Sequence, residues 1–211
     1  MPVKSGSRSY RSPVRAAAAE ETRARILAAA HTLLGDGKDL PPFSLDGVAK
    51  QAGVTRLTVY NQFESKLGLL EAVFDDVAQQ GGLTELPSVF AEADIEVALR
   101  RFVSVFCRFW SGHGSPGTLM PKFGALARLD PEIAASLRLR TERRRQGLTV
   151  LVKRLLPDAP KPNLELVDVL FALTGFEMFE ALSARNRSAA AAEALMQDLV
   201  QQTVRRFRNE R

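Results

Sequence analysis

One short segment carries side chains suited to reading the edges of base pairs. Arg56 can donate two hydrogen bonds to a guanine, and Asn61 or Gln62 can pair with an adenine. Leu57 and the methyl group of Thr58 can contact the methyl group of a thymine. These residues share the outward face of a short predicted helix, and such a set suits a helix that lies in the major groove of DNA.

Four nearby residues are better suited to phosphate groups than to bases. Ser44, Thr55 and Tyr60 offer hydroxyl groups, and Lys66 offers an ammonium group close to a helix start. Two of these residues have a structural alternative. Tyr60 is then a partly buried aromatic that covers a helix crossing, and Lys66 contacts only solvent.

Positioning these side chains requires two short helices that cross at a steep angle, with glycine in the turn. Ser44 is expected to cap a helix over 45–52, which Gly53 ends in a left-handed turn. Thr55 is expected to cap a second helix that runs to about Phe63. Small and apolar residues supply the inner faces: Leu45, Val48, Ala49, Ala52, Val54, Val59 and Phe63.

A helix over about 21–34 precedes this pair, and another begins at Ser65 and carries an apolar stripe to Val77. Residues 20–80 are therefore expected to form one domain, which ends near Gly81, Gly82 and Pro87. Residues 1–19 hold four basic and no acidic side chains and are expected to form a basic, flexible arm. Such an arm is either simply solvated or follows DNA phosphates.

Residues 81–211 continue as helices with no alternating strand pattern, so the predicted fold class is all-α. The expected helices cover about 95–111, 118–129, 132–156, 163–184 and 189–208. The helix over 163–184 is apolar nearly all round, which predicts that a second subunit covers one of its sides. A core helix of a monomer would show the same pattern.

The region from about Glu20 to Val77 resembles the DNA-binding domain of the tetracycline-repressor (TetR) family. Three segments carry the resemblance: Ile26-Leu27-Ala28-Ala29-Ala30, Val48-Ala49-Lys50-Gln51-Ala52-Gly53-Val54, and Thr58-Val59-Tyr60-Asn61-Gln62-Phe63-Glu64-Ser65-Lys66-Leu67-Gly68-Leu69-Leu70. The resemblance places Tyr60 and Lys66 on phosphates, and Arg56, Leu57 and Gln62 near bases. Gln62 stands where this family more often has His or Tyr.

The resemblance also implies a three-helix helix-turn-helix domain followed by a helical ligand-binding and dimerisation domain over 81–211. The expected partners are double-stranded DNA with a palindromic operator, a second copy bound through residues 163–208, and a small, largely apolar effector. The implied function is repression of transcription. Residues that either line a ligand pocket or form packed core are Phe102, Phe106, Trp110, Met120, Phe123, Phe176 and Phe179.

Five arginines crowd the helix expected over 132–156: Arg138, Arg140, Arg143, Arg144 and Arg145. They form either a solvated helix face or a surface for an acidic ligand or partner.

The sequence argues against several other classes. No apolar run approaches the roughly 20 residues of a membrane span, and the single cysteine, Cys107, suits a reducing cytoplasm. His31 and His113 lack neighbours at metal-ligand spacing, and no cofactor fingerprint is found, so neither a metal nor a cofactor is expected.

The net charge of +5 permits nucleic-acid binding without demonstrating it. His113 and Ser115 lie close together in a glycine-rich segment, but Ser115 lacks the glycine two residues before it that a nucleophile elbow requires. The chain is therefore not expected to be an enzyme. The alternatives are a helical interaction scaffold that has lost DNA binding or, less favoured, a small helical enzyme.

Overall fold

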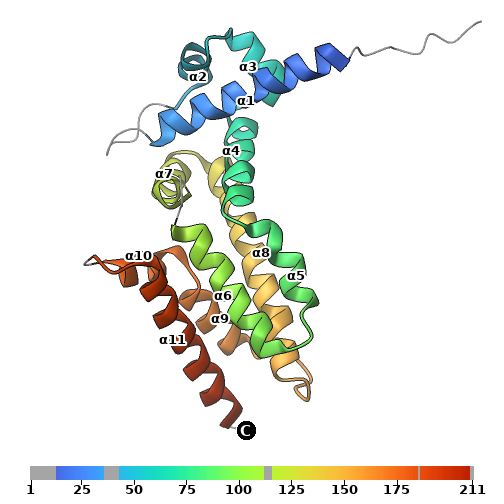
Figure 1. The fold of residues 1–211 in the computed structure, drawn as a ribbon, viewed down its shortest axis with the longest axis vertical. Helices are drawn as coiled ribbons and strands as arrows, with labels where there is room; N and C mark the ends of the chain where they lie inside the picture. Colours follow the sequence, from blue (N-terminus) through green and yellow to red (C-terminus); the bar gives the residue numbers. More distant parts are fainter. Residues whose placement is uncertain (1–12, 36–42, 112–115, 185, 210–211) are drawn as a thin grey trace, which may run out of the picture. The chain divides into compact units, whose positions relative to one another are not determined.

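The computed structural model describes residues 13–35, 43–111, 116–184 and 186–209, and every regular element in these ranges is helical (Figure 1). The all-α fold class is therefore confirmed. The chain divides between Ala72 and Val73 into two compact units. This division falls inside a continuous helix, whereas the sequence placed a domain boundary near Gly81.

The first unit contains α1 (Pro13–Gly35), α2 (Leu45–Ala52), α3 (Arg56–Phe63) and the beginning of α4 (Lys66–Gln80). α2 packs against both α1 and α3. The residues that close this small core are Ile26, Ala30, Leu34, Val48, Val59, Phe63 and Leu69. Their burial against one another holds three short helices in a helix-turn-helix arrangement that no single helix of this length could maintain in water.

The first helix is longer than expected. α1 begins at Pro13 rather than near Glu21, so residues 13–19 of the expected flexible arm are helical. Four consecutive alanines, Ala16 to Ala19, favour the helix, and a proline is well tolerated in its first turn. The rest of the expected arm, residues 1–12, lies outside the described residues.

The expected caps of α2 and α3 are confirmed. The Ser44 hydroxyl accepts a hydrogen bond from the Gly47 N–H at 3.1 Å, and the Thr55 hydroxyl accepts one from the Thr58 N–H at 3.1 Å. Gly53 ends α2 in the left-handed region, with φ of 65°. These local bonds satisfy amide groups that a helix terminus leaves without intrahelical partners.

The turn between α3 and α4 depends on a glycine that the sequence analysis did not explain. Glu64 adopts a φ of 64°, and the Ser65 hydroxyl accepts a hydrogen bond from the Gly68 N–H at 2.9 Å. A Cβ atom added to Gly68 would lie 2.2 Å from the carbonyl oxygen of Phe63. The two helices meet so closely here that no larger residue fits without a backbone shift.

The second unit contains the rest of α4 and the remaining elements. They are η1 (Leu83–Glu85), α5 (Leu86–Ala91), α6 (Ile95–Ser111), α7 (Pro116–Leu129), α8 (Pro131–Leu155), α9 (Leu164–Leu173), α10 (Phe176–Ser183) and α11 (Ala189–Asn209). α6 contacts α5, α7, α8, α10 and α11 and is the centre of the unit (Figure 1). Its fully buried side chains include Phe102 and Phe109.

The single helix expected over 163–184 is wrong, because the chain breaks into α9 and α10 at Thr174 and Gly175. Carbonyl groups exposed by the break are held by side chains from other helices. The Trp110 indole N–H donates to the Thr174 carbonyl at 3.0 Å, and Arg144 donates to the Phe171 carbonyl at 2.7 Å. The uniform apolarity of the segment concealed the break, since tertiary hydrogen bonds stabilise it.

The region of Gly81, Gly82 and Pro87, where a domain boundary was expected, contains η1 and the start of α5. Pro87 lies in the first turn of α5, where proline is tolerated and even favoured. The Arg154 guanidinium of α8 holds the far end of α5 by donating to the carbonyls of Phe90 at 3.1 Å and Ala93 at 3.2 Å. Pro87 thus lies at the beginning of a helix in the region where a boundary was expected.

Within the described residues, none of the helices combines the length and apolar character needed to span a bilayer.

Candidate nucleic-acid interface and interior cavity

α3 presents an exposed face of mixed chemistry. The Leu57 residue is 65% exposed and Tyr60 is 54% exposed, and the Arg56 side chain is 67% exposed. Asn61 is also exposed, and Thr58 is half-buried. A large aliphatic and an aromatic side chain beside a guanidinium on a short helix are typical of a surface that meets a partner.

Arg56 has a weak partner that another ligand could replace. Its guanidinium lies 3.2 Å from a carboxylate oxygen of Asp46 on α2, and both side chains are about two thirds exposed. An ion pair this exposed contributes between about 0 and 1 kcal/mol. The ion pair therefore orients the Arg56 side chain, and breaking it costs little free energy.

Three of the four expected phosphate contacts lie at helix starts, and the fourth, Tyr60, lies inside α3. Ser44 and Thr55 are the N-cap residues of α2 and α3, and Lys66 is the first residue of α4. The Thr55 and Thr58 hydroxyl groups lie 2.9 Å apart. Helix starts carry amide groups and a partial positive charge, which favour an anion.

The end of α3 is positioned by a residue that the sequence analysis missed. Arg23 of α1 donates a hydrogen bond to the Gln62 carbonyl at 3.2 Å, and its guanidinium lies 4.4 Å from the centre of the Phe63 ring. The Gln62 side chain itself is half-buried. No local signal pointed to Arg23, because its partner is 39 residues away.

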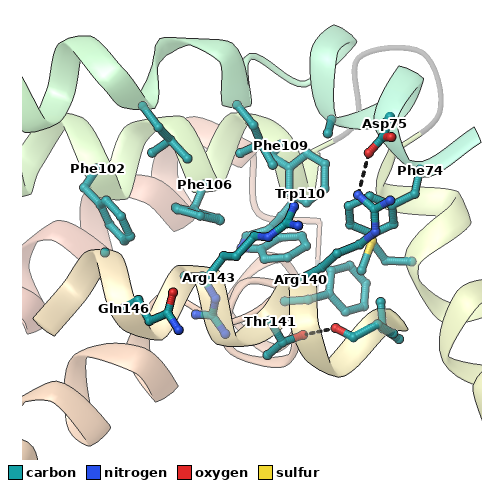
Figure 2. A pocket seen from close by; sticks show the side chains of 18 of the residues that line it. Phe74, Asp75, Phe102, Phe106, Phe109, Trp110, Arg140, Thr141, Arg143 and Gln146 are labelled. Atoms are coloured by element: carbon teal, nitrogen blue, oxygen red, sulfur yellow. Dashed lines mark hydrogen bonds and ion pairs between the residues drawn. The ribbon is translucent and has the colours of Figure 1, made fainter. Parts of the chain in front are cut away.

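The second unit contains a cavity of about 820 Å³ that is partly open to solvent, within the size range of small-molecule sites. Figure 2 shows aromatic side chains of α6 along one side and polar side chains of α8 along the other. Five of the seven residues predicted as pocket or core line it: Phe102, Phe106, Trp110, Met120 and Phe176. The other two, Phe123 and Phe179, are not among the lining residues and are buried.

Several lining residues were missed because they come from the end of α4, η1, α5 and the hidden face of α6. They are Phe74, Asp75, Ala78, Leu83, Leu86, Phe90 and Phe109. The apolar spacing of Leu83, Leu86 and Phe90 is the helical signal that could have found part of this wall.

The arginines of α8 are not a uniformly solvated face. Arg138 and Arg143 are exposed, whereas Arg140, Arg144 and Arg145 are half-buried. Arg140 pairs with Asp75 at 2.5 Å, and Arg145 pairs with Asp168. Three of the five, Arg140, Arg143 and Arg144, line the cavity.

Arg144 is the most constrained of these arginines. It donates to the Thr174 hydroxyl at 2.9 Å as well as to the Phe171 carbonyl, and its guanidinium lies 3.9 Å from the centre of the Phe171 ring. Burial lowers the pKa of Arg144 to about 10, an effect that the charge of Glu177 partly opposes. The guanidinium remains protonated at neutral pH and holds the α9–α10 break.

Other residues singled out by the sequence do not form a reactive site. Cys107 is buried on α6, and burial raises the pKa of its thiol to about 12. The described residues contain no group of three or more His, Cys, Asp or Glu side chains that could hold a metal ion. His113 and Ser115 lie outside the described residues.

Comparison with known proteins agrees with this architecture. The family model described as bacterial regulatory proteins, tetR family, matches residues 26–73, which begin in the second half of α1 and continue into α4. The chain is 48% identical over 59 residues to the uncharacterized HTH-type transcriptional regulator TtgW of Pseudomonas putida, covering 28% of this chain and 42% of that protein. It is 37% identical over 90 residues to the HTH-type transcriptional regulator EthR of Mycobacterium tuberculosis, covering 42% of this chain and 41% of that protein.

Two solved structures show that the fold extends over both units. A TetR-family regulator from Mesorhizobium loti matches with a TM-score of 0.65 at 18% identity, over 88% of this chain and 96% of that one. A transcriptional regulator from Aquifex aeolicus matches with a TM-score of 0.62 at 15% identity, over 86% and 98%.

The first unit is thus a helix-turn-helix domain and the second a helical domain of the kind that follows it in these regulators. Residues 26–73 match the family of bacterial regulatory proteins, tetR family, and the solved structures show that the rest of the chain shares their fold. Its curated relatives are named as transcriptional regulators and not as enzymes. The matched region spans about two fifths of the length of those relatives.

Proposed function

We propose that this protein is a transcriptional repressor that binds operator DNA in the cytoplasm through α3. The observation that carries the proposal is the exposed face of that helix, where Arg56, Leu57 and Tyr60 have more than half of their surface in solvent. A helix of this size fits the major groove, and its side chains offer hydrogen bonds, an apolar contact and a phosphate ligand. Binding there would exclude the polymerase from an overlapping promoter.

A homodimer that reads a palindromic operator is the second part of the proposal. One recognition helix contacts few base pairs, and a two-fold axis doubles the site. The segment 163–208, now resolved into α9, α10 and α11, exposes apolar side chains that a partner would cover. Leu164 is 67% exposed and Leu195 is 39% exposed.

Release by a small, largely apolar ligand is the third part. The support is the cavity of about 820 Å³ with its aromatic wall on α6. Phe74 and Asp75 line this cavity, and they belong to α4, which begins in the first unit. A ligand lowers the affinity for DNA only if it binds the DNA-free conformation more tightly than the DNA-bound one. The loss of DNA-binding free energy then equals the difference between the ligand's binding free energies for the two conformations.

The test is selection of bound genomic fragments by the purified full chain, followed by affinity measurements on the enriched site. Recovery of a palindrome supports the dimeric regulator. Tyr60→Ala is expected to weaken binding at all sequences, since it removes a phosphate contact. Arg56→Ala is expected to relax preference at particular base pairs, with a cost of about 1–3 kcal/mol at a guanine.

Asp46→Ala is the matched control for Arg56→Ala, because it breaks the same ion pair and leaves the guanidinium in place. It should retain the sequence preference. If no site is enriched and both α3 variants behave like the unmodified chain, the DNA-binding proposal fails, and a helical interaction scaffold takes its place. Sedimentation of the chain and of Leu195→Glu tests the dimer, which should dissociate in the variant if α11 lies in the interface.

A further inference from the structure

The cavity has two chemically different sides. Its α6 side is formed by Phe102, Phe106, Phe109 and Trp110, whose neighbouring ring centres lie between 4.6 and 5.9 Å apart along the Phe102–Phe106–Trp110–Phe109 series. Its α8 side carries guanidinium, hydroxyl and amide groups (Figure 2). A ligand that satisfies both sides must have an apolar body and a polar head.

The charged groups of the cavity favour a negative head. The lining residues include three arginines, Arg140, Arg143 and Arg144, and two carboxylates, Asp75 and Glu177, which leaves a net charge of +1. Asp75 already pairs with Arg140 at 2.5 Å, and the charge of Glu177 acts on Arg144. Asp75 is therefore not available to a cationic head without displacing a guanidinium.

Aromatic walls can also bind organic cations, but arginines already occupy faces of two lining rings. The Arg140 guanidinium lies 4.4 Å from the centre of the Phe74 ring, and that of Arg144 lies 5.8 Å from the centre of the Phe106 ring. An entering cation would be repelled by these charges and would find those faces partly taken. The electrostatics therefore select against the cationic alternative.

Arg143 is the cavity arginine that is free to bind a ligand. Arg140 and Arg144 have the partners described above, whereas Arg143 has no ion pair or hydrogen bond within the described part of the chain. Its side chain is exposed, so it retains its hydration until a ligand arrives. Gln146, also on α8 and also lining the cavity, adds an amide near the same side, whereas the Thr141 hydroxyl already donates to the Leu137 carbonyl at 2.9 Å.

We propose that the cavity binds an amphipathic organic carboxylate, with its head on Arg143 and its apolar body against the aromatic residues of α6. A planar guanidinium can bind both oxygens of a carboxylate, which gives geometry as well as charge. This inference names the chemical class of the effector and rests on the proposed function only for the claim that binding is coupled to DNA release. The binding site itself is tested without DNA.

Trp110 makes that test direct, because it is the only tryptophan in the sequence and lines the cavity. Its fluorescence is titrated with three probes of equal chain length, kept below micelle formation: dodecanoate, 1-dodecanol and dodecyltrimethylammonium. Dodecanoate is expected to bind at least about tenfold more tightly than dodecyltrimethylammonium, the difference expected for charge-assisted hydrogen bonds at a partly exposed site.

Variants then locate the head group. Arg143→Gln is expected to weaken dodecanoate about tenfold and to leave 1-dodecanol unchanged, and Arg143→Lys is expected to restore part of the loss. Arg138→Gln is the matched control, because it removes the same charge from an exposed site on α8 outside the cavity lining. It should bind all three probes like the unmodified chain.

The proposal is overturned if dodecanoate does not bind, if the cation binds as tightly, or if Arg138→Gln weakens dodecanoate as much as Arg143→Gln does. Failure here is separate from failure of the proposed function. A chain that enriches an operator but does not bind dodecanoate refutes only the carboxylate effector. If the chain binds dodecanoate through Arg143 but enriches no DNA, the carboxylate site is supported and the proposed repressor function is refuted.

Discussion

The surface of α3 and the cavity of the second unit are built in opposite ways. Six of the nine residues predicted to contact DNA belong to the eight-residue helix α3, and the other three lie at the starts of α2, α3 and α4. The cavity draws its lining from residues between 74 and 177, on α4, η1, α5, α6, α7, α8 and α10. Residues that share one face of a single helix can be recognised from a contiguous stretch of sequence. A site between helices forms only after the helices have packed, so its residues are scattered along the chain.

The arginines show the same contrast in energetic terms. Arg56 on α3 is exposed and holds a weak ion pair, so it can exchange its partner for a base or a phosphate. Arg144 in the second unit is largely removed from water and donates to a carbonyl and a hydroxyl. Its removal would take a donor from the Phe171 carbonyl and from the Thr174 hydroxyl, which would keep only its bond to the Leu170 carbonyl, so Arg144 acts as a structural residue.

The largest effect is expected from adding one methyl group to the first unit. Gly68→Ala would place a Cβ atom against the Phe63 carbonyl, and the forced backbone shift should destabilise the unit by about 2–3 kcal/mol. Hydrogen exchange of α3 amides measures the loss, and DNA binding should fall with it. Gly124→Ala in α7 is the control, because a Cβ there meets nothing within 4 Å. It should be neutral or should stabilise by up to about 1 kcal/mol.

In the second unit, the strongest effect is expected at the α9–α10 break. Arg144→Met retains much of the side-chain volume but removes the hydrogen bonds to the Phe171 carbonyl and the Thr174 hydroxyl. The free energy of unfolding should fall by about 2 kcal/mol, measured by urea titration with Trp110 fluorescence. Arg138→Met, at an exposed position of the same helix, should change it by less than about 0.5 kcal/mol. Equal losses of unfolding free energy in both variants would show that the loss of a positive charge, and not of the Arg144 hydrogen bonds, is responsible.

A smaller effect is expected from the cap of α3. Thr55→Ala removes the acceptor for the Thr58 N–H and should destabilise the helix by about 1 kcal/mol. Protection of the α3 amides against hydrogen exchange measures the change without involving DNA. Thr55→Ser retains the acceptor and should behave like the unmodified chain. If Thr55→Ala retained full protection, α3 would be held by its packing alone.

The smallest effect is expected at Cys107. Burial raises the pKa of its thiol to about 12, so the reactive thiolate is nearly absent near neutral pH. Iodoacetamide should not label the folded chain at pH 8 but should label it in urea. The same shift means that its contribution to stability is complete below the unfolded pKa of about 9 and is lost as pH rises toward 12. Rapid labelling of the folded chain would contradict its burial.

The helix-turn-helix could be predicted almost residue by residue. Ser44, Gly53 and Thr55 specify their helix ends through local hydrogen bonds and a left-handed turn, and all three behave as expected. The errors were in the second unit. Pro87 lies in the first turn of α5, a helix that was not predicted, and the apolar run over 163–184 contains a break at Thr174. Local rules failed where the deciding partner, such as Trp110 or Arg144, is distant in the chain.

The sequence by itself determined the all-helical fold, the helix-turn-helix and the exposure of Arg56, Leu57, Tyr60 and Asn61 on α3, because helix period, caps and turns act over a few residues. Only the tertiary structure decided which aromatics line the cavity and which are packed core. It also separated Arg143, exposed at the cavity, from Arg144, committed to the α9–α10 break. The reason is physical: burial and ion pairing are properties of neighbours in space, and neighbours far apart in the chain leave no local pattern.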